Sequence, residues 1–194
     1  MALMDQLTEA GRALARPAAS KTGLHESVAA QLIPVAMAAV MAALTKNASR
    51  PKGADALANA LNAHDGGLLN DLDRAGQDDV IADGRKILGH AFGAKQDGIE
   101  AALAKACGGL DAKQVSAVLA MAAPAVLAAL GRAKRDQSLN PKSLAELLAE
   151  QTARDQAAAP QLSGITQLID APTKESKGFG RKIFGGLFGR KAPN

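Results

Sequence analysis

The sequence predicts an all-α protein, and three observations support this fold class. Alanine dominates the composition, and it has the best helix propensity of all residues because it loses no side-chain entropy on folding. Aromatic residues make up only 2% of the chain, and Trp and Tyr are absent. Two long alanine-rich segments are apolar at most positions, which is typical of central helices. Such a chain builds its core from closely packed helices rather than from bulky side chains.

The first half of the chain predicts four helical segments. A helix over about 3–15 ends near Pro17, and a longer apolar helix runs over about 26–44. The long helix contains Pro34, which we expect to bend or divide it. A third helix covers about 54–64, and a short one contains Leu68, Leu69 and Leu72.

The second half predicts three more helices. One covers about 96–107 and ends at the glycine pair 108–109. Asp111 caps the next, an apolar helix interrupted by Pro124. Asn140 and Pro141 begin the last one, in which three leucines share a face: Leu144, Leu147 and Leu148. The longest apolar run, 117–130, is too short to span a bilayer and indicates a buried helix.

The two apolar segments resemble each other. GLHESVAAQLIPVAMAAVMAAL (23–44) and GLDAKQVSAVLAMAAPAVLAAL (109–130) share an opening Gly-Leu and a closing run of Ala, Val and Leu. Alanine richness alone produces part of this likeness. The placement of Gly-Leu before each helix predicts a bundle of two pseudo-repeated halves.

Three segments carry a resemblance to a known family: HDGGLLNDL (64–72), ADGRKILGHAFGAKQ (82–96) and GLDAKQVSAVLAMAAPAVLAALGR (109–132). Together they resemble the YidB-like bacterial family, a domain of unknown function, over about 25–135. ILGHAFG (87–93) is the most specific part. The resemblance implies a soluble multihelical domain with no established activity.

The charge distribution divides the chain into parts. The net charge is +4, yet residues 174–191 hold six Lys or Arg and one Glu, so residues 1–173 sum to about −1. We expect an N-terminal helix (1–20), a helical domain (21–156), a linker (157–176) and a flexible basic tail (177–194). A nearly neutral body argues against nucleic acid as a partner.

The usual catalytic and cofactor motifs are missing from the sequence. There is no G-x-S-x-G elbow, and the single Cys107 has no recognisable partner histidine. Gly84 and Gly89 have the spacing of a phosphate loop, but the following Lys and Ser/Thr are absent. We therefore expect no enzyme activity, cofactor or small-molecule substrate. The lone cysteine and the absence of a signal-like N-terminus favour the cytoplasm.

Three histidines, His25, His64 and His90, leave a metal site as a minor alternative. None has zinc-finger spacing, and capping or bonding to buried backbone groups is the simpler interpretation. His64 and His90 both lie in family-like segments, so they could meet in the fold. The aspartates at 71, 73, 78 and 79 lack a calcium-loop pattern and indicate a solvated surface.

One internal segment is repeated at the end of the chain. GRKILGHAFGAK (84–95) and GRKIFGGLFGRK (180–191) agree at eight of twelve positions. The internal copy is predicted to be a packing element, with Phe92 as a core anchor and Gly89 and Gly93 leaving room for a neighbouring backbone. Its motif residues are Ile87, Leu88, Gly89, His90, Phe92 and Gly93.

The tail copy carries the functional prediction. Its apolar residues recur on one helical face and basic residues accompany them: Phe179, Arg181, Lys182, Ile183, Phe184, Leu187, Phe188, Arg190 and Lys191. Its glycines would keep an isolated helix unstable, so we expect it to order on a partner. Three interpretations remain open: a protein groove, including self-association with another copy, an anionic membrane surface, or a solvated tail. The preferred function is a non-enzymatic adaptor or scaffold, with a peripheral membrane protein as the alternative.

Overall fold

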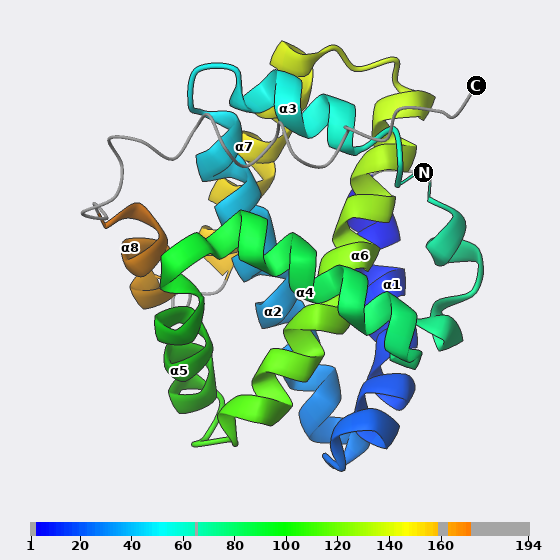
Figure 1. Cartoon of the computed structure of the whole chain (residues 1–194), viewed down its shortest axis with the longest axis vertical. Helices are drawn as coiled ribbons and strands as arrows, with labels where there is room; N and C mark the ends of the chain where they lie inside the picture. Colours follow the sequence, from blue (N-terminus) through cyan, green and yellow to red (C-terminus); the bar gives the residue numbers. More distant parts are fainter. Residues whose placement is uncertain (1–2, 65, 159–162, 172–194) are drawn as a thin grey trace, which may run out of the picture.

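The computed structural model describes residues 3–64, 66–158 and 163–171, and these residues form helices and no strand (Figure 1). The all-α prediction is confirmed. The α-helices are α1 Leu3–Thr22, α2 Glu26–Ala48, α3 Gly53–Ala60, α4 Asp78–Phe92, α5 Gln96–Ala106, α6 Ala112–Asp136, α7 Pro141–Ala158 and α8 Ser163–Asp170. Short 3-10 helices lie between them: η1 Gly67–Asn70, η2 Leu72–Gly76 and η3 Gly93–Lys95.

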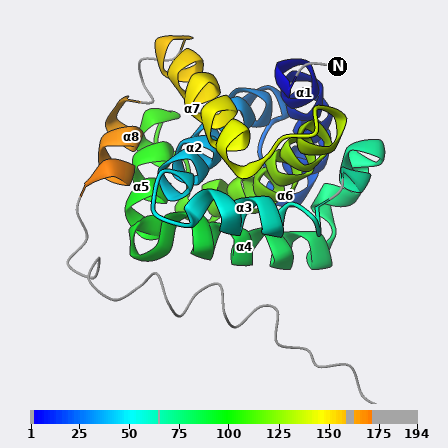
Figure 2. The same cartoon turned by 90° about the horizontal axis from the view of Figure 1, so that it is seen from above.

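Two long helices, α2 and α6, form the centre of the core. Residues 118–131 of α6 are buried without interruption, so this helix is covered on every side. Helix α4 lies across α6, while α1 packs against both α2 and α6 (Figures 1 and 2). The N-terminal helix is therefore part of the core and not a separate unit, which corrects the expected boundary at residue 20.

The two central helices are also long and apolar enough to cross a membrane by length and composition. In the folded domain, however, 83% of the apolar window of α6 and 61% of that of α2 are buried inside. Core helices of globular domains have the same composition. The apolar run at 117–130 is thus a buried helix, as expected, within a helix longer than the run itself.

Prolines lie inside three helices without ending them. Helix α1 continues through Pro17 to Thr22, so the predicted end near residue 15 is wrong. Pro34 likewise does not divide α2, nor Pro124 α6. Each proline removes one backbone hydrogen bond. Burial of apolar side chains on both sides, such as Leu14 and Ala18 around Pro17, outweighs that loss.

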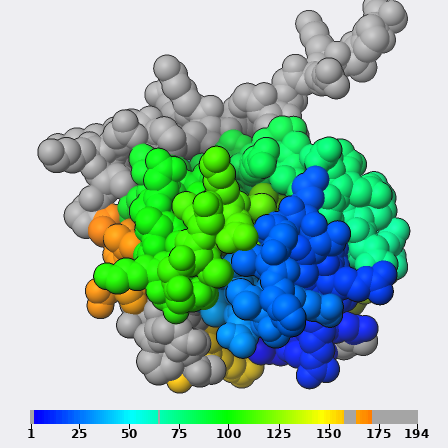
Figure 3. Space-filling model, turned by 90° about the horizontal axis from the view of Figure 1, so that it is seen from below, coloured from blue at the N-terminus to red at the C-terminus, as the bar shows by residue number. Residues whose placement is uncertain are grey.

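The central helices begin in the same way. His25 caps α2, its Nδ1 accepting from the Ser27 amide at 3.4 Å. Asp111 caps α6, its Oδ1 accepting from the Lys113 amide at 2.6 Å, and Gln114 completes a capping box. The side-chain amide of Gln114 also donates to the Thr22 carbonyl at 3.2 Å. These two N-terminal ends lie side by side at one end of the molecule (Figure 3).

The neighbours of the central helices differ. Both central helices contact each other, α1 and α4, but α2 also packs against α3, α7 and α8, whereas α6 packs against α5, η1 and η2. The likeness between 23–44 and 109–130 is therefore clearest in the helices themselves and their caps.

The segment after α3 follows the surface of α6 closely. Helix α3 ends at Ala60, four residues earlier than predicted, and residues 61–64 form turns. A Cβ on Gly131 of α6 would overlap the His64 carbonyl oxygen, so glycine is required there. This contact holds His64 against α6.

The C-terminal helices correct one prediction. Asn140 begins α7 as expected, its Oδ1 accepting from the Ser143 amide at 2.9 Å. Residues 163–170, expected within a linker, form α8, which buries Ile165 and Ile169. Lys95 donates to the carbonyls of Ile169 and Ala171 at the end of α8. Burial, together with the charges of Arg50 and Lys46, lowers the pKa of Lys95.

Candidate functional site

Residues 84–92 of the internal copy form the second half of α4, and its last three residues form η3. Ile87, Leu88 and Phe92 are 8%, 0% and 5% exposed, and they face the core. His90 and Gly89 lie on the exposed side of the helix. The segment is a packing element, and its glycines lie in a helix and at its end rather than in a phosphate-binding loop.

The glycine that permits close packing is not the one that the sequence indicated. A Cβ on Gly89 or Gly93 would meet no neighbouring atom within 4 Å, so neither glycine marks a close backbone approach. Gly93 instead ends α4 with a φ of 56°. At Gly84, by contrast, a Cβ would overlap the Ala120 carbonyl oxygen of α6. Gly84 is therefore the residue that lets α4 lie against α6.

The contact at Gly84 has a cause in α6. In an α-helix, the carbonyl of residue 120 normally accepts from the amide of residue 124. That residue is Pro124, which has no N–H, so the Ala120 carbonyl lacks its helical partner. Only glycine on α4 lets a neighbouring backbone reach this carbonyl. The proline on α6 and the glycine on α4 thus act together: one leaves a carbonyl without a partner, and the other lets a neighbouring backbone reach it.

The tail residues predicted to bind a partner lie outside the described residues. They are Phe179, Arg181, Lys182, Ile183, Phe184, Leu187, Phe188, Arg190 and Lys191. The described part of the chain is therefore where a complementary surface has to be sought.

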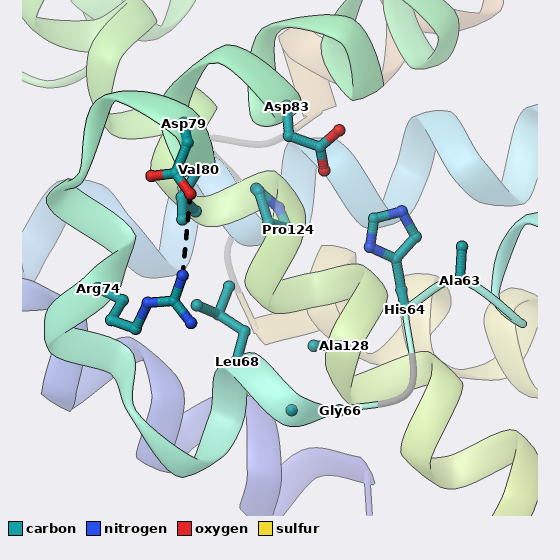
Figure 4. Close-up of a pocket in the computed structure, with 11 residues that line it drawn as sticks. Ala63, His64, Gly66, Leu68, Arg74, Asp79, Val80, Asp83, Pro124 and Ala128 are labelled. Carbon is teal, nitrogen blue, oxygen red and sulfur yellow. Dashed lines mark ion pairs between the residues drawn. The ribbon is translucent and has the colours of Figure 1, made fainter. Parts of the chain in front are cut away.

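A polar pocket of about 340 Å³ lies where α4, α6 and the segment after α3 meet. Asp83 of α4 and His64 extend toward the same space, with Pro124 behind them (Figure 4). On the other side Arg74 pairs with Asp79 at 3.8 Å. We call this the His64 pocket. Its charged groups could contact a small polar ligand, but no hydrogen bond between His64 and Asp83 organises them.

The histidines do not come together. His90 lies seven residues beyond Asp83 on α4, about 10 Å further along the axis, and it does not line the pocket. His25 caps α2 at a distant end. Within residues 3–64, 66–158 and 163–171, no group of three or more His, Cys, Asp or Glu side chains could hold a metal ion.

The other ionisable candidates have structural environments. Burial raises the pKa of the Cys107 thiol, which lies half-buried at the end of α5. A raised pKa disfavours the reactive thiolate. Asp78 and Asp79 lie in the first turn of α4, where a negative charge suits the helix dipole. Lys21, bonded to Asp78 at 2.6 Å, holds the pKa of that carboxyl below its usual range.

An apolar groove of about 460 Å³ lies between α1 and α2 and is closed on one side by the end of α7. We call it the α1–α2 groove. Its apolar lining includes three methionines, Met4, Met37 and Met41, and the exposed fraction of Met4 is 39%. Arg12, Glu26 and Asp155 supply its charged groups.

Asp155 is the more buried of the two carboxylates that line the groove. Burial raises its pKa, and a hydrogen bond from Gln151 Nε2 at 2.8 Å partly offsets that effect. Sequence reasoning missed the groove. The available signal was the i, i+4 pair Met37 and Met41, one turn beyond Pro34, on a helix whose smeared hydrophobicity concealed an open face.

The comparisons with known proteins agree with the fold and assign no activity. The sequence model of a family described as "Bacterial protein of unknown function (DUF937)" matches residues 5–133. The match begins earlier than the resemblance over 25–135, and so it includes most of α1. Neither the curated proteins nor the solved structures contain a match to the chain.

Proposed function

Because the chain belongs to this bacterial family of unknown function, DUF937, we propose a function from the chain's own residues: it is a non-enzymatic helical adaptor that docks to a protein partner through residues 177–191. A second copy of the same chain counts as such a partner. In this proposal the helical body is the scaffold and the tail is the ligand.

One observation carries the proposal: the tail keeps a packing residue at every position that is buried within the internal copy, 84–95. The internal copy buries Gly84, Ile87, Leu88 and Phe92 and half-buries Ala91. The corresponding tail residues are Gly180, Ile183, Phe184, Phe188 and Leu187. A solvated tail has no physical reason to retain this set, whereas a segment that packs on a helix does.

The body supports the proposal by its chemistry. Two buried polar side chains of the body bond to neighbouring side chains: Glu100 accepts from Gln96 at 2.8 Å and from Ser116 at 3.0 Å, and Gln151 donates to Asp155 at 2.8 Å. Such groups stabilise the bundle. The apolar α1–α2 groove offers contact area of the kind that binds a helix.

A peripheral membrane protein is the second candidate. The tail combines three Phe with six Lys or Arg in 174–191, which suits an anionic lipid surface. Flotation of the full chain with vesicles that contain phosphatidylglycerol tests this candidate. Binding that is lost in vesicles of neutral lipid alone would favour the membrane anchor over the adaptor.

Affinity capture from a bacterial lysate tests the adaptor, with the full chain compared against a variant whose residues 177–191 are scrambled. The scrambled tail keeps length, composition and charge, so it separates docking of a defined helical face from attraction of a basic segment. We expect one or more protein partners, or the untagged chain itself, to be retained by the native order alone. Equal retention by both chains would contradict the proposal.

A further inference from the structure

We infer that the α1–α2 groove is the docking site for residues 177–191, so that the body and tail of this protein bind each other. The inference rests on the proposed docking role of the tail and names the surface that receives it. It follows from a likeness between two helix surfaces, one on α6 that is covered and one on α2 that is open.

The two central helices carry the same local pattern around their prolines. In α6, Ala120 and Ala128 lie four residues before and after Pro124. In α2, Ala30 and Ala38 lie four residues before and after Pro34. Each proline deprives the carbonyl four residues earlier of its helical partner. Both helices therefore present a surface of small residues that includes one backbone carbonyl without a partner in its own helix.

These two surfaces differ in what covers them. Ala120, Pro124 and Ala128 are buried: Gly84 of α4 lies against the Ala120 carbonyl, and Gly66, after α3, lies against the Ala128 carbonyl. Ala30 and Pro34 are exposed, Ala38 is half-buried, and all three line the α1–α2 groove. Helix α2 thus lacks, among the described residues, the cover that α4 gives to α6.

The tail is a copy of the element that provides that cover. If residues 180–191 lie on α2 as 84–95 lie on α6, Gly180 takes the place of Gly84 beside the Ala30 carbonyl. Phe184 and Phe188 then take the places of Leu88 and Phe92 and pack on the helices that flank α2. Methionine side chains adapt to aromatic neighbours, and Met4, which lines the groove, is exposed and available for such a contact.

Length and connection fit this occupant. The residues of α2 that line the groove run from Glu26 to Met41, about 22 Å along the helix, which leaves room for a helix that crosses α2 as α4 crosses α6. The described chain ends at Ala171, next to α2, since Asp170 pairs with Lys46 at 3.0 Å. Twenty-three residues, 172–194, remain beyond this point, so the tail begins beside a helix that lines the groove.

Charge is complementary as well. The groove has two acidic side chains, Glu26 and Asp155, against one basic one, Arg12. The tail copy has Arg181, Lys182, Arg190 and Lys191 and no acidic residue within 177–191. Burial in the apolar groove disfavours the charged form of the Asp155 carboxylate. A tail cation beside Asp155 would stabilise that charged form.

Tryptophan fluorescence of the full chain tests the inference, because the chain has no Trp of its own. Leu187→Trp places a probe at the position that corresponds to half-buried Ala91 of α4, where a larger side chain can fit at the edge. We expect emission at a shorter wavelength than that of the same protein unfolded in urea. Ala38→Lys, which adds a charge inside the groove, should return the emission of the folded protein to that of a solvated Trp.

Ala101→Lys is the matched control, since Ala101 is exposed on α5 and does not line the groove. It should leave the emission unchanged. A shift independent of protein concentration places the tail in its own groove, and one that grows with concentration places it in a second copy; both support the inference. Thermal unfolding of each variant, followed by circular dichroism, shows that the fold is retained.

Two outcomes overturn the inference. A solvated emission at every protein concentration, or one that changes only on adding anionic vesicles, shows that the tail does not occupy the groove. A short-wavelength emission that Ala38→Lys leaves unchanged shows that it packs elsewhere. Neither outcome decides the proposed function, which depends on whether the scrambled tail loses the captured partner.

Discussion

Gly84 is the residue at which the backbone of α4 contacts the backbone of α6. Its hydrogen in place of a side chain lets α4 lie against the Ala120 carbonyl, which Pro124 leaves without a helical partner. The weak Cα–H···O contact available there contributes little by itself. The larger effect is geometric, because it allows Leu88 and Phe92 to reach the core.

Two substitutions on the same helix test this role. Gly84→Ala should lower the free energy of unfolding by about 3 kcal/mol or more, because its Cβ overlaps backbone that cannot move aside. Gly89→Ala should raise it by up to about 1 kcal/mol, because that position is open and alanine favours the helix. Urea denaturation followed by circular dichroism measures both. Equal effects of the two changes would contradict the assigned contact.

At the scale of elements, α8 shows how a short helix is kept on the bundle. Eight residues are too few to be stable alone. Ile165 and Ile169 bury their side chains, and Lys95 donates to two carbonyls at the C-terminal end, where a positive charge also suits the helix dipole. The lysine therefore joins α8 to the start of α5.

Lys95→Met tests this attachment. It keeps a long apolar stem but removes the donor, so α8 should open more often. We expect amide hydrogen exchange in 163–171 to become about fivefold faster or more, which corresponds to the loss of about 1 kcal/mol. Exchange in α6 should not change. Lys105→Met, an exposed change on α5, is the control, and an equal effect there would argue against a specific role of Lys95.

Element prediction succeeds where local signals agree and fails where packing decides. The caps at Asp111 and Asn140 are local chemistry, and the structure confirms both. Helix α1 extends beyond its predicted end, because the apolar face that continues through Ala18 outweighs the proline signal. From the sequence, α8 is expected to be part of a linker, because its own residues show no strong helix signal. Its stability comes from distant residues such as Lys95, which no local pattern reveals.

At the scale of the whole molecule, the sequence indicated the repeated segment but not the surface that could receive its copy. The burial of Phe92 followed from its being the only aromatic residue before the tail. The α1–α2 groove depends on how three helices meet, and α2 is apolar on nearly all sides in the sequence. Only the structure distinguishes its open face from its buried ones.

The claim that the tail acts as a copy of α4 is tested most directly by two glycine substitutions in the Leu187→Trp chain. Gly186 corresponds to exposed His90, so Gly186→Ala should favour the docked helix, by about fivefold in the docking equilibrium. Gly180 corresponds to Gly84, so Gly180→Ala should reduce docking although it gives the same gain in helix propensity. The docked fraction is measured from the tryptophan emission. Opposite effects are the predicted result, and an equal gain from both substitutions would contradict the account.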